Sequence, residues 1–257
     1  MSDAPDEAPR PEMRPLLEIA ANSLDSALAA QAGGADRIEL CAALEVGGLT
    51  PSPALVLQVR ERLRIPVYVL IRPRAGDFAY SPSEHATMLG DIAWCRAAGC
   101  DGVVTGALTP DGDVDAARCE ELVAAAAGLG VTFHRAIDVC RDPAQALEAI
   151  IALGCERVLS SGGATSAAEG AARLRALVEQ AGDRIVLMPG AGIDESNIAQ
   201  LLRLTGAREF HASAKRVLAS AMRHSSAASL GMAAGELRSD EDQVRRLVAA
   251  LRHDAVA

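Results

Sequence analysis

Short apolar runs of three to five residues alternate along the chain with longer segments rich in Ala and Leu. The short runs predict eight β-strands whose starts are 21 to 35 residues apart: Leu16–Ile19, Arg37–Leu40, Val67–Ile71, Gly102–Thr105, Val131–Phe133, Arg157–Leu159, Ile185–Met188 and Glu209–His211. The longer segments predict amphipathic helices between them, among them Ser83–Ala98, Asp115–Ala127, Pro143–Leu153 and Glu195–Leu204. Glycines such as Gly99, Gly154 and Gly206 often precede the next strand, as expected at helix C-termini.

Alternating strand and helix signals indicate an α/β fold with parallel crossovers. Eight such units predict a (β/α)8 TIM barrel in a single domain, a fold that typically needs about 250 residues. A doubly wound open sheet is the alternative. The barrel is favoured because the units are evenly spaced and no G-x-G-x-x-G turn follows the first strand.

The barrel domain is predicted over residues 16–252. Residues 1–15 hold four prolines and mixed charges, which predicts a disordered N-terminal arm, and residues 253–257 form a tail. Residues 212–238, rich in Ser, Ala, Gly and Met, are expected to be an unusually long loop after the eighth strand. The run Ser239–Asp242 then predicts the N-terminus of a last helix that ends near Leu251.

Composition excludes several classes of function. The net charge of −9 and the absence of a Lys/Arg run argue against nucleic-acid binding. No apolar run approaches the roughly 20 residues that span a bilayer, so no membrane partner is expected. The chain has six cysteines without a C-x-x-C pair and no secretory signal, which predicts reduced thiols and a cytoplasmic location.

In a barrel, polar residues at the C-terminal ends of strands indicate function. Glu18 and Glu39 belong to neighbouring strands and would share one mouth of the barrel. Such a pair could bind a divalent cation, divide acid and base roles, or neutralise nearby arginines. The structural alternative is that they form buried ion pairs with Arg72 and Arg135.

Further strand ends supply other candidates. Arg72 and Arg74 flank a proline after the third strand and could bind a carboxylate or phosphate, or form a salt-bridged loop. His134, followed by Arg135 and Asp138, and His211 on the eighth strand are candidates for acid–base catalysis or ordinary core histidines.

Two glycine-rich loops are candidates for anion binding. Ser161-Gly162-Gly163 and Gly190-Ala191-Gly192 would leave backbone N–H groups free before a helix, which is how barrels bind phosphate, although tight turns use the same residues. Cys41, at the end of the second strand, could bind a soft metal such as Cu(I), or be a small buried apolar residue.

The ordered motifs resemble the CutC family of copper homeostasis proteins. The resemblance covers nearly the whole chain after the N-terminal arm and rests on these blocks: Leu17–Ile19, Gly34–Cys41, Gly47–Ser52, Ile71–Arg74, Gly76–Phe78, Tyr80-Ser81, Thr132–Ala136, Asp138, Leu159–Gly162, Gly190–Gly192 and the segment near Met222-Arg223. It implies a TIM barrel, a cytoplasmic location and a role in copper tolerance or trafficking.

The resemblance also implies a copper site formed by cysteines near the ends of the first two strands. The second cysteine matches Cys41. The first falls at Ile19–Asn22, where this chain has Ala20 and Ala21. Cys41 therefore needs another soft ligand to bind Cu(I), and none is adjacent in the sequence.

Three functions follow from these patterns. The first is a copper homeostasis protein that binds Cu(I) through Cys41. The second is an enzyme that acts on a small phosphorylated or carboxylated compound, with His134 or Glu39 as the proton carrier and Arg72 and Arg74 binding the anion. The third is a scaffold or dimerisation module, in which residues 212–238 contact a partner subunit and the protein forms a homo-oligomer.

Overall fold

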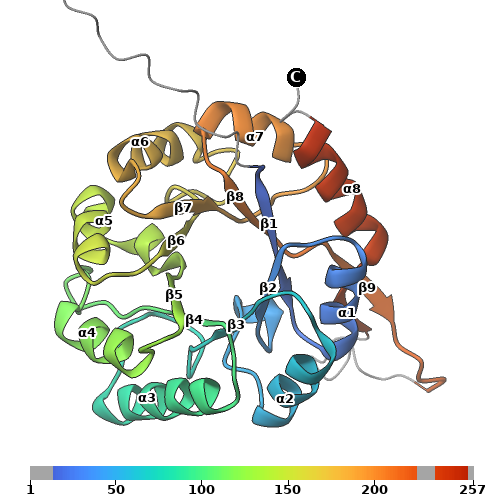
Figure 1. Ribbon diagram of the computed structural model, residues 1–257, viewed down its shortest axis with the longest axis horizontal. Helices are drawn as coiled ribbons and strands as arrows, with labels where there is room; N and C mark the ends of the chain where they lie inside the picture. Colours follow the sequence, from blue (N-terminus) through green and yellow to red (C-terminus); the bar gives the residue numbers. More distant parts are fainter. Residues whose placement is uncertain (1–13, 225–234, 254–257) are drawn as a thin grey trace, which may run out of the picture.

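The computed structural model describes residues 14–224 and 235–253. Its main sheet contains eight parallel strands in the order β7-β6-β5-β4-β3-β2-β1-β8, arranged as a ring inside a layer of helices (Figure 1). The strands are β1 (Leu16–Ala21), β2 (Arg37–Leu40), β3 (Val67–Leu70), β4 (Gly102–Thr105), β5 (Gly130–Phe133), β6 (Arg157–Ser160), β7 (Val186–Pro189) and β8 (Glu209–Ala212). The predicted (β/α)8 barrel is confirmed, and the open-sheet alternative is wrong.

The barrel closes because β1 pairs with β2 on one side and with β8 on the other, while a parallel bridge joins Gly190 to His211 between β7 and β8. The register places Glu18 opposite both Arg37 and His211. Residues from β1, β2 and β8 thus become neighbours at one side of the barrel mouth.

The helices start and end close to the predicted positions. They are α1 (Leu24–Ala32), α2 (Pro53–Arg62), α3 (Pro82–Ala97), α4 (Ala116–Ala125), α5 (Pro143–Ala152), α6 (Ala171–Ala181), α7 (Ile198–Thr205) and α8 (Glu241–His253), with short 3-10 turns η1 (Leu44–Val46) and η2 (Arg135–Val139). Helix α3 begins with a capping box in which Ser81 and Glu84 satisfy each other's backbone N–H groups. None of the helices in the described ranges has the length and apolar character needed to cross a membrane.

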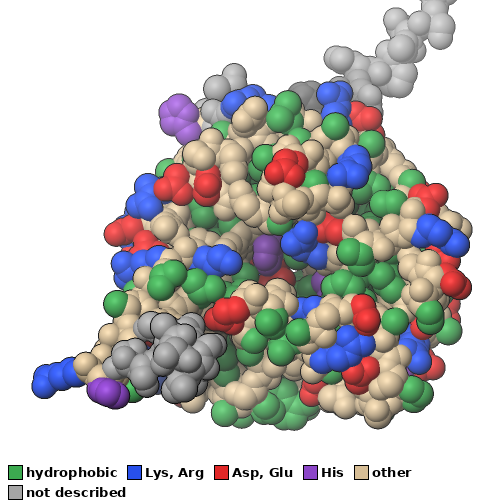
Figure 2. All heavy atoms as spheres, turned by 180° about the vertical axis from the view of Figure 1, so that it is seen from behind, with side chains coloured by type: hydrophobic (Ala, Val, Ile, Leu, Met, Phe, Trp, Pro, Cys, Tyr) green, Lys and Arg blue, Asp and Glu red, His purple; other side chains and the backbone are tan. Residues whose placement is uncertain are grey.

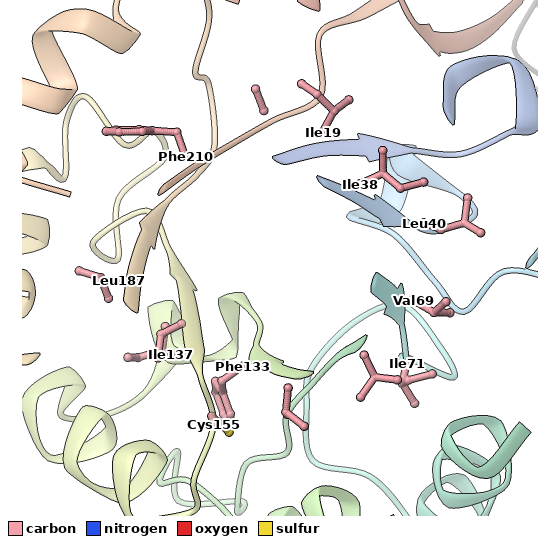
Figure 3. Packing of buried hydrophobic residues seen from close by; sticks show 14 of the residues in the cluster. Ile19, Ile38, Leu40, Val69, Ile71, Phe133, Ile137, Cys155, Leu187 and Phe210 are labelled. Carbon is pink, nitrogen blue, oxygen red and sulfur yellow. The ribbon is translucent and has the colours of Figure 1, made fainter. Parts of the chain in front are cut away.

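Alternation along each strand separates the core from the site. In β2, Ile38 and Leu40 belong to the large apolar core between strands and helices, and Figure 3 shows them on the outer side of the strand ring. The intervening residues Arg37 and Glu39 face the barrel interior, where they are also buried. Cys41 continues this inward series and packs with Tyr68 and other interior residues.

The prediction of one long loop over residues 212–238 is wrong. Strands β9 (Lys215–Ala219) and β10 (Gly235–Ser239) form an antiparallel ribbon there, separate from the barrel sheet, and Figure 1 shows β9 outside the helical ring near α1. The prediction failed because both strands are short, β9 is mostly exposed and β10 mostly half-buried, and backbone pairing rather than an apolar pattern defines them. Most of the predicted N-terminal arm and of the C-terminal tail lies outside the described residues.

Candidate active site

A cavity of about 560 Å³ opens at the C-terminal ends of the strands. Figure 2 shows a hollow near the middle of this face, with histidine and Lys or Arg side chains beside it. Its lining includes most of the predicted candidates together with apolar residues: Ala20, Glu39, Cys41, Leu44, Val46, Gly47, Arg72, Phe78, His134, Arg135, Asp138, Val139, Leu159, Ala191, Gly192, Ile193, His211, Ala212, Ser213 and Lys215. This is where ligands bind in barrels of this kind.

Glu18, Glu39 and His211 form one cluster at the β8-β1-β2 side of the cavity. The Nδ1 atom of His211 lies 2.8 Å from Oε1 of Glu18 and 3.7 Å from Oε2 of Glu39. The other oxygen of Glu18 accepts a hydrogen bond from Arg37. Oε2 of Glu39 is buried and has no hydrogen-bond partner among the described residues. Glu39 is therefore the carboxyl of this cluster that remains available to a ligand.

The surroundings shift the pKa values of the three groups in this cluster differently. Burial opposes ionisation of Glu18, but the charge of Arg37 and the hydrogen bond from His211 outweigh it and lower its pKa to about 2. Burial raises the pKa of Glu39 to about 7, with His211 opposing the shift and the Glu18 charge adding to it. Burial disfavours the imidazolium of His211, but the hydrogen bond to Glu18 and the two carboxyl charges raise its pKa overall. Glu39 can thus gain and lose a proton near neutral pH, while the two carboxyl groups favour the protonated form of His211.

The predicted ion pairs of Glu18 and Glu39 with Arg72 and Arg135 are wrong. Glu18 instead pairs with Arg37, which also donates to Glu209 over 2.8 Å. Glu209 in turn accepts from Arg157 over 2.6 Å, so alternating charges fill the barrel interior below the cavity. The sequence Arg-Ile-Glu-Leu of β2 already indicated that Arg37 and Glu39 lie on the same side of the strand, since residues two apart in a strand face the same side.

Arg72 and Arg74, although two residues apart, have different surroundings. Arg72 is buried at the cavity, and its Nη atoms donate to the backbone carbonyls of Val46, Gly48 and Gly76 at 2.8 to 2.9 Å. Its Nε atom has no partner among the described residues. Arg74 does not line the cavity, and its guanidinium is engaged by Asp77, Glu84 and backbone carbonyls. The salt-bridged loop that was the alternative therefore describes Arg74.

The loop Ser161–Gly163 does form an anion cradle, but the anion is the carboxylate of Asp138. This carboxylate accepts from Ser160 Oγ at 2.6 Å, from Ser161 N at 3.0 Å and from Gly163 N at 3.1 Å. The N–H of Gly162 donates to Ser160 Oγ. In this structure Asp138 and Ser160 accept these N–H groups, and the anion-binding role of Ser161, Gly162 and Gly163 toward a ligand stays a prediction.

Arg135 closes the same cradle and still reaches the cavity. Its Nε donates to Asp138 over 2.8 Å and its Nη2 to Ser161 over 2.9 Å. Its side chain is 44 % exposed, and its Nη1 has no hydrogen bond to the described residues. Arg135 is therefore held in place with donors left for an anionic ligand.

In the second glycine-rich loop, Gly190-Ala191-Gly192, the first glycine is required by the local packing. The N–H of Gly190 donates to the carbonyl of Ser160, so it is not free for an anion, and a Cβ at Gly190 would lie 2.5 Å from Leu159. Ala191, with φ of 82°, and Gly192 line the cavity. The N–H of Gly190 is thus already used within the protein, and the anion-binding roles of Gly190 and Gly192 stay predictions.

His134 lies across the cavity from the cluster, at the end of β5. It is buried, its ring centroid is 4.7 Å from that of Phe78, and its Nδ1 accepts from the backbone N–H of Ala136. Burial and the nearby charge of Arg72 lower its pKa to about 3, so the ring is neutral at physiological pH. The cavity therefore has a neutral imidazole, His134, on one side and a carboxyl that titrates near neutral pH, Glu39, on the opposite side.

Cys41 is buried at the cavity, and burial followed by the charges of Glu39 and Glu45 raises its pKa. It supplies the only sulfur atom in the described cavity lining, because Ala20 lines the cavity where a second thiol would be needed. Linear Cu(I) coordination by two thiolates therefore does not fit these residues. Among the described residues, the group with ligand atoms close enough for a metal ion is Glu18, Glu39 and His211, all oxygen or nitrogen donors.

Lys215 and Phe78 line the cavity but were not among the candidates predicted from the sequence. Lys215, at the start of β9, lines the mouth of the cavity and was hidden in the segment predicted to be a loop. Phe78 contacts both His134 and Arg72, whose guanidinium carbon lies 5.1 Å from the ring centroid. The motif Gly76-Asp77-Phe78 was the one sequence signal for Phe78.

Comparisons with known proteins agree with the resemblance in the sequence. The family model described as the CutC family matches residues 15–216. The CutC family protein of Xylella fastidiosa (strain Temecula1 / ATCC 700964) is 56 % identical over 240 residues, covering 93 % of this chain and 90 % of the relative. That of Xanthomonas axonopodis pv. citri (strain 306) is 54 % identical over 236 residues, covering 92 % and 98 %.

Solved structures give the same result. A crystal structure of CutC from Streptococcus agalactiae, named for copper homeostasis, has a TM-score of 0.74 and 33 % identity, covering 77 % of this chain and 97 % of that one. Phosphoribosylanthranilate isomerase from Thermotoga maritima has a TM-score of 0.56 at 12 % identity, covering 93 % and 98 %. The latter likeness concerns the fold alone.

Proposed function

The chain belongs to the CutC family, and on this premise we propose that it is an enzyme that performs acid–base chemistry on a small anionic molecule in the strand-end cavity. The observation that carries the proposal is the Glu39 carboxyl, whose buried Oε2 has no hydrogen-bond partner among the described residues and lies 3.7 Å from His211 in the cavity. A buried polar atom without a partner is costly unless a ligand or water satisfies it.

Each group has a distinct role in this proposal. Glu39 transfers a proton to or from the ligand, because a carboxyl that titrates near neutrality serves as both acid and base. Glu18 holds His211 beside it through a 2.8 Å hydrogen bond. Arg135 and Lys215, at the mouth, bind the phosphate or carboxylate of the ligand.

The experiment is a conversion assay with purified protein and pools of small phosphorylated and carboxylated compounds, followed by mass spectrometry. Wild type should convert a compound that Glu39→Gln leaves unchanged. Glu45→Gln is the control, since this exposed carboxyl lies nearby in sequence but does not line the cavity, and it should retain the conversion. Equal conversion by wild type and Glu39→Gln would contradict the proposal.

Copper homeostasis through Cu(I) binding at Cys41 is the second candidate. The placement of the Cys41 thiol in the cavity supports it, as does the name of the related protein from Streptococcus agalactiae. The missing second sulfur at Ala20 weighs against it. The six cysteines are all free, and we accordingly propose a reducing, cytoplasmic location for either function. A homo-oligomer stays a prediction.

An anaerobic Cu(I) competition titration separates the two candidates. Under the enzyme proposal, Cys41→Ala leaves the weak Cu(I) affinity of the reduced protein unchanged. The Ala20→Cys variant adds the missing sulfur and should bind Cu(I) more tightly than wild type. Stoichiometric, tight binding by wild type that is lost in Cys41→Ala would establish the copper function instead.

A further inference from the structure

His134 presents a single hydrogen-bond donor to the cavity. Its Nδ1 accepts from the N–H of Ala136 at 3.3 Å and therefore carries a lone pair. In a neutral imidazole the proton must then reside on Nε2. Nε2 is buried and has no hydrogen-bond partner among the described residues. The ring is also fixed by its contact with Phe78, so this donor is oriented before any ligand arrives.

Arg72 supplies a second oriented donor. Three backbone carbonyls hold its Nη atoms, and its guanidinium lies against the same Phe78 ring that contacts His134. Its Nε–H is buried without a partner in the described parts of the chain. The hydrogen bonds to the three carbonyls use only the Nη atoms, so they position the guanidinium while the Nε–H donor stays unused.

The carboxyl of Glu39, with its unpaired Oε2, belongs to the lining of the same cavity from another part of the barrel. Glu39 lies on β2 and His134 follows β5, three strands further round the ring. The cavity thus contains two oriented N–H donors and one carboxyl, each buried and without a partner among the described residues. Oriented donors of this kind stabilise an oxygen that gains negative charge during a reaction.

We propose that His134 Nε2–H and Arg72 Nε–H form an oxyanion site for the carbonyl oxygen of a small anionic carbonyl compound, while Glu39 removes the proton from the adjacent carbon. The inference rests on the proposed function and names its substrate class. The C–H electron pair forms the new C=C bond, and the carbonyl π pair moves to the oxygen, which His134 and Arg72 stabilise. Return of the proton from Glu39 to the former carbonyl carbon, with the hydroxyl proton of the adjacent carbon passing to the oxyanion, gives the isomer of an α-hydroxycarbonyl compound without any co-reactant.

A neutral imidazole suits this role better than an imidazolium. A neutral donor polarises the carbonyl without giving up its proton, and a ring kept neutral by its surroundings is an established arrangement for enolisation. Arg135 and Lys215 lie at the cavity mouth and would bind the anionic group of the same compound. The lining therefore matches both ends of one small molecule.

The first test is NMR of the intact protein labelled with ¹⁵N-histidine. His134 should remain neutral with its proton on Nε2 between about pH 5 and about pH 8. A charged ring, or a proton on Nδ1, would overturn the oxyanion site. This outcome is independent of the conversion assay with Glu39→Gln, so failure of the inference and failure of the proposed function are distinguishable.

The second test titrates wild type with 2-phosphoglycolate, whose carboxylate mimics the enediolate oxygens beside a phosphate. The Nε2–H resonance of His134 should move downfield, and His134→Phe should weaken binding by about tenfold or more. His85→Gln is the control, because His85 pairs with Glu121 on the outer helices, and it should bind like wild type. A His134 resonance that does not respond to millimolar probe would refute the proposal.

Discussion

The imidazole of His211 donates a hydrogen bond from Nδ1 to the carboxylate of Glu18 over 2.8 Å, across the β1–β8 seam that closes the barrel. Glu18 is buried completely on the interior side of β1. The same carboxylate accepts from Arg37, so it is shared between a structural ion network below and a cavity residue above. This contact ties barrel closure to the orientation of His211 beside Glu39.

Glu18→Gln should destabilise the protein by about 3 kcal/mol at neutral pH, because it removes one of the two carboxylates that pair with buried Arg37 and leaves Arg37 to share the charge of Glu209 with Arg157. The pKa of Glu18 is lowered to about 2, so its contribution is complete above the ordinary value near 4.5 and is lost as the pH falls toward about 2. Urea unfolding of wild type and variant at several pH values should show this difference narrowing in acid.

Glu148→Gln provides the control for that measurement. The pKa of Glu148 is also lowered to about 2, by Arg184 and Gln180, but the carboxyl is exposed on the helical surface. Its removal should leave the free energy of unfolding almost unchanged. Equal effects of the two substitutions would show that burial of Glu18 has no energetic role.

Arg72→Met should destabilise the protein by roughly 2 kcal/mol or more, since the carbonyls of Val46, Gly48 and Gly76 lose their donor. Hydrogen exchange should quicken in the loops after β2 and β3, which these bonds connect. Arg74→Met, two residues away, removes contacts of a partly exposed guanidinium outside the cavity and should have a smaller effect. Unchanged exchange in Arg72→Met would show that Arg72 does not connect the loops.

Asp138→Ala should open the cradle formed by Ser161 and Gly163 to inorganic phosphate. The substitution removes the internal carboxylate and leaves its backbone N–H donors and Arg135 free. It should cost about 2 kcal/mol of stability, recovered in part when phosphate is added. Calorimetry with phosphate would measure the new site, and Asp113→Ala, an exposed partner of Arg141, is the control. Identical phosphate affinity in wild type and Asp138→Ala would contradict this prediction.

The sequence was sufficient to predict the fold because apolar strands and amphipathic helices repeat eight times. It also brought Glu18, Glu39 and His211 together, since strand ends of a barrel share one mouth. It could not show that the glycines of Ser161–Gly163 bind Asp138, because an N–H cradle does not specify its acceptor. Nor could it show that Arg72 lines the cavity whereas Arg74 does not, because this depends on which backbone carbonyls of the loop after Pro73 each guanidinium contacts.

The residues missed from the sequence lacked a local pattern. Lys215 reaches the cavity only because β9 turns away from β8 at Ala214, which has φ of 43°. The pairing of β9 with β10 connects segments that are distant in the sequence, and neither strand shows an alternation of apolar and polar residues. Long-range pairing of this kind is determined by backbone hydrogen bonds rather than by composition.

A ¹³C NMR titration of the Glu39 carboxyl in the intact protein tests its acid–base role. We expect a pKa of about 7, raised by burial next to Glu18, so that Glu39 gains and loses its proton near neutral pH. Stability contributed by the protonated carboxyl is then present below the ordinary value near 4.5 and lost as the pH rises through about 7. A carboxyl that titrates near its ordinary value would instead make Glu39 an ionised structural partner of His211 and would rule out its role as an acid–base group.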